Sequence, residues 1–198
     1  GLPDTDGRAA RGRGAVLAIG FGTAVAMWAV GYVCRLPPAP APSIVTGLAM
    51  VALMLAGGFV AGRLGDGGWG GGLRAGLVTS LLNMLVLGSL LASKEVPNRV
   101  VPSALLWLPG ALVFGALLGA LGALAGDRTR SRGAGRAINW TAAFVLVDAA
   151  ATLLLLAVGG LVTSEGAGLA VVDWPNSFGY NMFLYPLSRM TGGVYYEH

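Results

Sequence analysis

The side chains best suited to chemistry are four ionisable residues in the second half of the chain. Asp148 interrupts an apolar stretch, Asp173 stands in the run Asp-Trp-Pro, and Glu197 and His198 close the sequence. From the sequence alone, Glu197 is a solvated carboxylate, and His198 is a terminal or interface histidine. Asp148 differs from these, because an ionisable group among lipid chains is costly and usually has a function.

Asp148 lies about halfway along the apolar segment 138–163. We expect its carboxylate to face the other helices, to pair with a donor, or to be protonated. Asn83 and Asn139 are candidate donors, although Asn139 lies near the membrane edge. Two interpretations stay open: a group that contacts protons or substrate, and a protonated carboxyl that hydrogen-bonds to a neighbouring helix.

Residues 164–196 form an extramembrane stretch that is dense in structural signals. Gly166 and Gly168 allow tight turns where the chain leaves the preceding helix. The aromatic residues of this stretch are typical of a belt at the membrane interface, and anchoring is the reading that composition favours. Such a loop could also cover the flat apolar face of a porphyrin. The belt consists of Trp174, Phe178, Tyr180, Phe183, Tyr185, Tyr195 and Tyr196.

The elements that position these residues are membrane-spanning helices. The 198-residue chain is 55% hydrophobic and only 11% charged, whereas soluble domains carry about 25% charge. Five segments approach the roughly 20 apolar residues that a span needs: 15–35, 44–63, 73–93, 101–126 and 138–163. The third is the weakest, because polar residues interrupt it. The sequence therefore predicts an all-α, polytopic transmembrane bundle with about five spans.

The basic residues predict the orientation in the membrane. Net charge is +4, and nine of the thirteen basic residues fall on the side of the N-terminus if all five segments span. By the positive-inside rule, the N-terminus is cytoplasmic and residues 164–198 lie on the outer side of the membrane. Because these arginines flank spans, they do not indicate nucleic-acid binding. The inner set is Arg8, Arg11, Arg13, Arg63, Arg74, Arg128, Arg130, Arg132 and Arg136.

The glycines and a basic linker divide the chain. Residues 1–126 form a four-span module of unknown role, 127–137 a basic cytoplasmic linker, and 138–198 a second unit. The tract 65–72 lacks the Gly-Lys-Ser/Thr end of a phosphate loop and is predicted to be a flexible turn. The patterns Gly115-x-x-x-Gly119 and Gly122-x-x-x-Gly126 predict close helix packing, within the bundle or in a homo-oligomer.

The second unit, 138–198, resembles the first helix, first outer loop and start of the second helix of the haem A synthase (cytochrome oxidase assembly) family. Several pieces follow in the family's order: Gly-Gly-Leu-Val-Thr, Gly-Ala-Gly-Leu-Ala, Asp-Trp-Pro, Phe-Gly-Tyr-Asn-Met-Phe-Leu-Tyr-Pro and a closing Glu-His. The resemblance implies an oxidoreductase that converts the methyl group of haem O to the formyl group of haem A. It implies a bound haem b in the complete protein, an electron donor and cytochrome oxidase assembly factors as partners, and membrane lipid around the helices.

The resemblance also implies roles for particular residues. Family members begin their second helix with Glu-x-x-His-Arg, in which the histidine ligates haem iron. Glu197 matches the catalytic Glu and His198 the first x, so the ligand is expected two residues past His198 and no metal ligand within this chain. We therefore expect this chain alone neither to hold haem tightly nor to turn over. The implied haem-pocket loop contains Asp173, Trp174, Pro175, Tyr180 and Asn181.

Other readings remain open. The cysteine pair that many family members carry in this loop is missing, since Cys34 is the only cysteine. A non-enzymatic multipass scaffold, or a subunit of a larger membrane complex, is the main alternative. A transporter half with Asp148 as coupling carboxylate and Pro109 as hinge is a third, disfavoured because we find no internal repeat.

Overall fold

The computed structural model describes residues 5–36, 40–65, 67–93, 95–130, 138–164, 166, 171–173, 175–186 and 189. They form five long helices: α1 (Thr5–Val33), α2 (Ser43–Leu64), α3 (Gly68–Leu91), α4 (Ala104–Arg128) and α5 (Trp140–Ser164). A hairpin of two short strands, β1 (Asn176–Ser177) and β2 (Tyr180–Asn181), and the 3-10 turn η1 (Met182–Leu184) follow. The predicted all-α bundle is confirmed.

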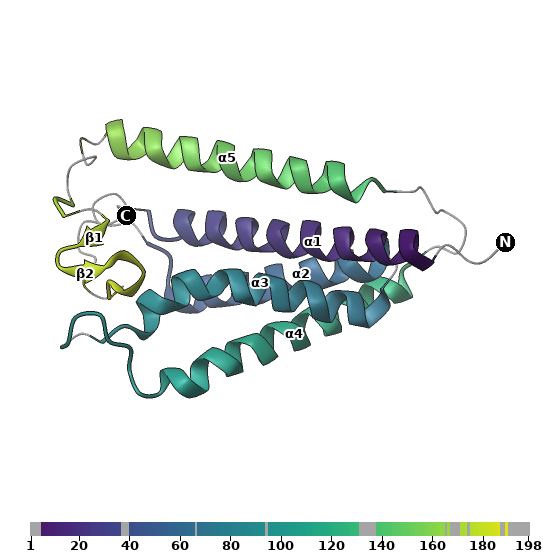
Figure 1. Ribbon diagram of the computed structural model, residues 1–198, viewed down its shortest axis with the longest axis horizontal. Coiled ribbons are helices and arrows are strands. Elements are labelled where there is room, and N and C mark those ends of the chain that lie inside the picture. Colours follow the sequence, from purple (N-terminus) through teal and green to yellow (C-terminus); the bar gives the residue numbers. More distant parts are fainter. Residues whose placement is uncertain are drawn as a thin grey trace.

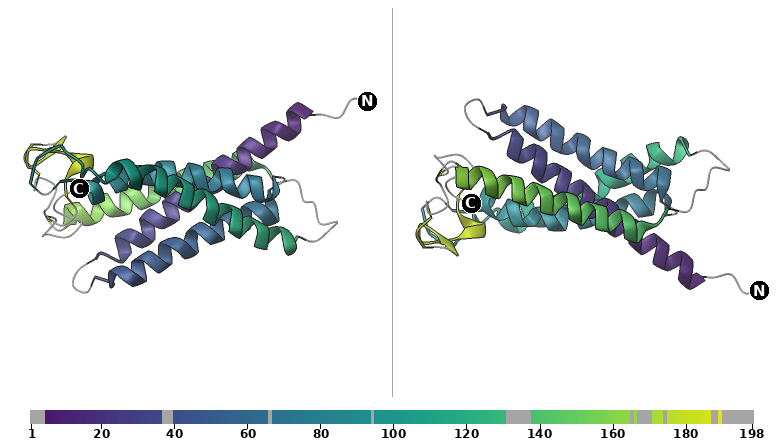
Figure 2. Two further views of the ribbon diagram at one scale, coloured as in Figure 1. Left: turned by 90° about the horizontal axis from the view of Figure 1, so that it is seen from below. Right: turned by 90° about the horizontal axis from the view of Figure 1, so that it is seen from above.

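The helices run side by side along the length of the molecule. The hairpin lies at the end where α4 begins and α5 finishes, and α1 begins at the opposite end (Figure 1). The first turns of α1 project beyond the other helices, which both views of Figure 2 show. Consecutive long helices alternate in direction, as expected for short connections in a multi-pass protein.

Four of the helical stretches are long and apolar enough to cross a membrane: Arg11–Val33, Ser43–Leu64, Ala104–Arg128 and Trp140–Ser164. The protein is therefore membrane-embedded. α3 has 24 residues, which is about 36 Å of helix, but its polar side chains keep it out of this set. Segment 73–93 is therefore less apolar than the other segments, as the sequence indicated. The helix itself is similar in length to the others.

The hydroxyl-bearing residues of α3 face inward. α3 contacts α1, α2 and α4, and Thr79, Ser80 and Ser89 are buried. The Thr79 hydroxyl lies 2.9 Å from the carbonyl oxygen of Gly20 in α1 and 3.0 Å from that of Ala75. Since a buried hydroxyl needs a partner, these positions join α3 to its neighbours instead of marking a break in the helix.

Glycines bring the backbones of α2, α3 and α4 into direct contact. A Cβ added to Gly58 or Gly62 of α2 would collide with the backbone of Gly119 or Ala123 in α4. From the other side, Gly72 of α3 meets the same turn of α4. The expected small-residue packing of α4 is confirmed, and it operates within the chain.

The predicted flexible turn over 65–72 is wrong in its second half. α3 begins at Gly68, and Gly71 and Gly72 are buried. A side chain at Gly72 would strike Gly119 of α4, so these glycines serve helix packing. Trp69 remains 60% exposed, as expected of a residue at the membrane interface.

α5 is the least enclosed helix. None of its residues is buried, and its main helix contact is with α1. Phe144 packs edge-on against Phe21 with ring centroids 5.3 Å apart, and Trp140 lies against Gly14. Figure 1 shows α5 beside α1 and away from α4.

Substitution of Gly62 by valine should destabilise the bundle. The new side chain would collide with the Ala123 backbone in α4, and overpacking of this kind costs about 1–3 kcal/mol. Gly47→Val in the same helix is the matched control, because nothing lies within 4 Å of a Cβ at Gly47. Thermal unfolding in detergent should show a lowered Tm for Gly62→Val alone. Equal Tm values for the two variants would contradict the packing described.

Candidate functional site

The outer loop after α5 is organised around the carboxylate of Asp173. One carboxylate oxygen accepts from the amide of Phe178 at 2.8 Å and the other from the amide of Gly179 at 2.6 Å. The Asp173 carbonyl accepts from the amide of Asn176 at 2.9 Å. One side chain therefore closes the whole turn from Asp173 to Gly179.

The hairpin turn needs this support. Strands β1 and β2 pair antiparallel, with Asn176 opposite Asn181 and Ser177 opposite Tyr180. The two central residues, Phe178 and Gly179, have φ angles of 52° and 79°, as in a type I′ turn. Glycine adopts such angles freely, whereas phenylalanine does so at a cost. The carboxylate offsets that cost by satisfying both turn amides.

These hydrogen bonds also fix the charge of Asp173. The amide of Gly179, followed by that of Phe178, holds the pKa of the Asp173 carboxyl below its ordinary value of 3.8, against the opposing effect of desolvation. A carboxylate that accepts from backbone amides is stabilised in its charged form. Asp173 is therefore an anion throughout the neutral range.

Aromatic rings form the interior of the loop. Tyr180 and Tyr185 are buried and pack edge to face with centroids 5.6 Å apart. Arg189 donates to the Tyr180 hydroxyl at 2.9 Å, and its guanidinium lies 5.6 Å from the Tyr180 ring centroid. In contrast, Phe178 and Phe183 are each 48% exposed and present apolar surface outward.

The loop is docked on the end of α3 and on the α3–α4 connection. The amide of Asn181 donates to the Asn98 side chain at 2.5 Å, and Asn98 stands in the α3–α4 connection. The Ser89 hydroxyl of α3 donates to the carbonyl of Phe183 at 3.3 Å. Through these contacts, the chain that leaves α5 is bound to α3, which belongs to the predicted four-span module.

The predicted pocket residues separate into distinct positions. Asp173, Tyr180 and Asn181 hold the loop together, and the Asn181 side chain accepts from the amide of Phe183 at 3.0 Å. Pro175 is exposed. Trp174, Glu197 and His198 lie outside the described residues, as does most of the predicted linker 127–137.

Asp148 departs from the first of the three arrangements that the sequence left open, in which its carboxylate faces the other helices. Its side chain is exposed on α5 and does not face the four-helix bundle. The proposed donors lie elsewhere: the Asn83 amide nitrogen donates to the Met27 sulfur at 3.3 Å, and Asn139 caps the start of α5, more than two helical turns from Asp148, by accepting from the amide of Ala142 at 3.0 Å. The expected pairing is wrong, because α5 touches the bundle through a different face.

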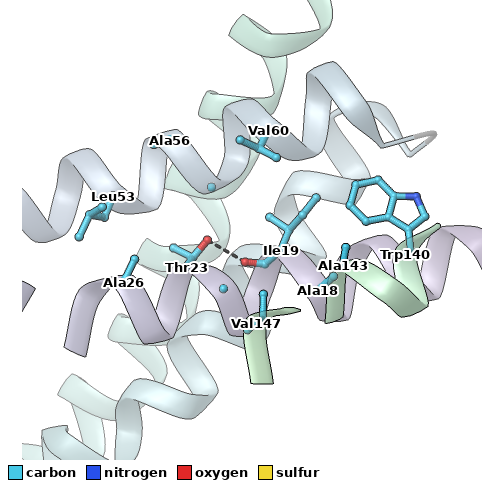
Figure 3. A pocket seen from close by; sticks show the side chains of 12 residues that line it. Ala18, Ile19, Thr23, Ala26, Leu53, Ala56, Val60, Trp140, Ala143 and Val147 are labelled. Atoms are coloured by element: carbon cyan, nitrogen blue, oxygen red, sulfur yellow. Dashed lines mark hydrogen bonds between the residues drawn. The ribbon is translucent and has the colours of Figure 1, made fainter. Parts of the chain in front are cut away.

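An apolar cavity of about 340 Å³ opens between α1, α2 and α5. Thr23 is its only hydroxyl, and this hydroxyl already donates to the carbonyl of Ile19 at 2.8 Å (Figure 3). The lining residues carry no ionisable side chain; they are Ala18, Ile19, Gly22, Thr23, Ala26, Leu53, Ala56, Gly57, Val60, Trp140, Ala143 and Val147. The cavity suits a lipid chain and offers no group for catalysis.

The apolar cavity between α1, α2 and α5 offers no ligand for haem iron. Haem iron takes imidazole, thiolate, thioether or phenolate ligands, and the cavity lining contains none of these. The single histidine, His198, lies outside the part of the chain that the structure describes. No group of three His, Cys, Asp or Glu side chains within that part could hold a metal ion.

Comparison with known proteins gives no assignment: no family model, curated protein or solved structure matches this chain.

Two residues that hold the outer loop in place were missed by sequence reasoning. Asn98 has a φ of 59°, and the run Pro97-Asn98 is a turn signal that could have indicated it. Its role as acceptor for Asn181, 83 positions away, had no sequence signal. Arg189 had no sequence signal either, because its contact with Tyr180 depends on the folded loop.

The Asp173 turn should loosen in acid. Folding lowers the pKa of Asp173, so its carboxylate stabilises the folded turn. This stabilisation is fully present above the ordinary pKa of 3.8 and is lost as pH falls through the lower pKa of the folded state. The Gly179 amide proton, followed by NMR from neutral pH downward, should shift upfield below pH 3.8. Asp173→Asn should abolish this titration. A Gly179 shift that titrates equally in Asp173→Asn would contradict the assignment.

Removal of the Asn98 acceptor should release the loop from α3. Asn98→Gly keeps the positive φ but loses the bond to the Asn181 amide, which costs about 0.5–1.5 kcal/mol. The Asn181 amide should then exchange with deuterium roughly two- to tenfold faster. Asn98→Asp retains an oxygen acceptor and is the control, with exchange close to that of the parent. Unchanged exchange in Asn98→Gly would show that the bond does not hold the loop.

Proposed function

We propose that this chain supplies the first helix and outer loop of a haem A synthase-like oxidoreductase, with α1–α4 as an accessory module. The proposal places the N-terminus in the cytoplasm and the Asp173 loop on the outer side of a bacterial inner membrane. The reaction would be oxidation of the haem O methyl group to the formyl group of haem A, with haem b and further ligands supplied outside the described residues.

The observation that supports this most is the closed Asp173 turn. It joins two separate pieces of the resemblance, Asp-Trp-Pro and Phe-Gly-Tyr-Asn, through hydrogen bonds of 2.8 and 2.6 Å. A simple interfacial belt needs only aromatic rings at the right depth. A carboxylate that fixes a hairpin is an additional feature, and it gives the loop one defined shape.

The geometry refines which residues would touch a porphyrin. Tyr180 and Tyr185 are buried within the loop, so they position it. Phe178 and Phe183 expose about half of their surface, and flat aromatic rings make favourable contacts with apolar ligands. Under this proposal, Asp173 and Asn181 are positioning residues, and the two phenylalanines supply the contact surface.

The alternative is a non-enzymatic membrane scaffold or a subunit of a larger complex. Its support is the backbone-to-backbone packing of α2, α3 and α4, which favours a rigid body over a substrate path. The apolar cavity, which lacks ionisable residues, fits this reading as well. An assay of haem composition separates the two functions.

Disruption of the gene that encodes this chain should leave its host with haem O and without haem A. Extraction of membranes and chromatography of the haems gives both species in one measurement. Restoration with the intact gene is the control, and restoration with an Asp173→Ala version should yield less haem A at equal protein level. Normal haem A in the disrupted strain would overturn the enzymatic proposal in favour of the scaffold.

The 198-residue chain alone should not bind haem b stoichiometrically. The expected ligand lies outside it, so titration in detergent should give no Soret band that saturates at one haem per chain. A saturable band would show that the iron ligand is within this chain and would contradict the ligand assignment made here.

A further inference from the structure

We propose that one flank of α5, centred on Asp148, is the docking surface for another membrane-spanning helix. The partner helix would lie outside these 198 residues and would carry a lysine or arginine side chain at the depth of Asp148. This inference does not depend on the proposed haem chemistry, because it rests on the position and surroundings of Asp148 alone.

The docking flank is distinct from the face that touches α1. Contact with α1 and the cavity involves Trp140, Phe144 and Val147. At 3.6 residues per turn, Asp148 lies about 100° from Val147 and about 40° from Phe144, so the flank borders the α1 face on one side only. We define the α5 flank as the exposed residues that share this side: Thr141, Val145, Asp148, Thr152, Leu155, Gly159 and Thr163.

The α5 flank has the pattern of a helix interface. Its members follow one another at intervals of three or four residues, which keeps them in one continuous stripe. A Cβ added at Gly159 would meet nothing within 4 Å, so the small residues here serve no packing inside the described chain. Small and hydroxylated residues are enriched where membrane helices approach each other closely.

Asp148 lies within the hydrocarbon layer. It is eight residues beyond Trp140, the first residue of α5, which is about 12 Å along the helix. The 25 residues of α5 measure about 37 Å, against a hydrocarbon core of about 30 Å. Even if α5 is centred in the membrane, Asp148 remains well below the interface.

No described residue satisfies this carboxylate. The Asn83 amide nitrogen donates to the Met27 sulfur at 3.3 Å, and Asn139 stands at the start of α5, more than two helical turns from Asp148. An acidic group at this depth faces other helices, pairs with an opposite charge or lines water. Since α5 turns it away from the bundle, its partner has to come from outside.

Charge complementarity selects a basic helix over a second copy of this chain. A parallel second copy would place another Asp148 at the same depth, and two carboxylates disfavour each other's charge. The nearest basic residue on α1 is Arg13, next to the Gly14 that contacts Trp140, so a copy offers its cation only about 12 Å away from the required depth. Lipid chains offer no donor.

The test uses a synthetic helix as probe. The Cys34→Ser chain with Thr152→Cys on the flank is reconstituted in phosphatidylcholine vesicles with a leucine–alanine spanning peptide. That peptide carries one lysine at the Asp148 depth and a cysteine one turn away. Mild oxidation should give a disulfide-linked heterodimer on gels. Leu153→Cys, at nearly the same depth but on another exposed side, is the matched position and should give little.

The charge dependence decides the outcome. Loss of the heterodimer in Asp148→Leu, and with a peptide whose lysine is replaced by leucine, would support the proposal. Equal cross-linking in any of these combinations would overturn it, as would a heterodimer at Leu153→Cys of equal yield. A dominant chain-to-chain dimer at Thr152→Cys would assign the flank to a second copy instead. Circular dichroism of Asp148→Leu checks that the helices are retained.

Discussion

In the middle of the molecule, the backbones of α2, α3 and α4 touch where their side chains are reduced to hydrogen. Gly119 of α4 meets Gly58 of α2 on one side and Gly72 and Gly76 of α3 on the other. In a membrane, apolar side chains gain little by leaving lipid, so helices associate mainly through close packing and interhelical hydrogen bonds. The glycine contacts provide that closeness, and the Thr79 hydroxyl adds a hydrogen bond from α3 to α1. The rest of the structure is built on this three-helix junction.

The outer loop depends on the three-helix junction indirectly, through α3. α3 is held by α2 and α4, and its far end offers Ser89 and the connection with Asn98 as a docking place. The Asp173 turn gives the loop its shape, while α3 gives it a location. This division explains why residues chosen for a binding role are largely engaged in holding the loop, and why the exposed phenylalanines are better placed for contact with a ligand.

α5 takes part neither in the glycine junction nor in the docking of the loop on α3. It lacks the glycine contacts of the junction, meets α1 through Trp140 and Phe144, and leaves every other side open. An apolar helix can remain in that condition at little cost, because lipid replaces protein neighbours. The carboxylate of Asp148 is different, because an ionisable side chain that faces lipid is costly. For this reason we infer that α5 packs against a further partner.

Much of the fold was readable from hydropathy and composition. Long apolar segments separated by basic or proline-containing connections predicted the helices to within a few residues at most ends, and the glycine patterns of α4 predicted close packing. The glycine tract at 65–72 led to a wrong prediction. Glycine weakens helices in water, whereas in a membrane it allows two helices to pack closely. The direction of the Asp148 side chain also misled: the cost of a buried charge predicts that a partner exists, but it does not say on which side of the helix.

Sequence by itself determined that this chain is a membrane-embedded helical protein, since the length and apolarity of a span are local properties of consecutive residues. It also determined the turn chemistry of Asp-Trp-Pro through Gly179, where all partners lie within a few positions. Only the tertiary structure decided that Asn98 receives the Asn181 amide, that α3 lies among α1, α2 and α4, and that Asp148 faces outward. These are contacts between residues far apart in the chain, and they follow from how helix surfaces fit together, which no local pattern records.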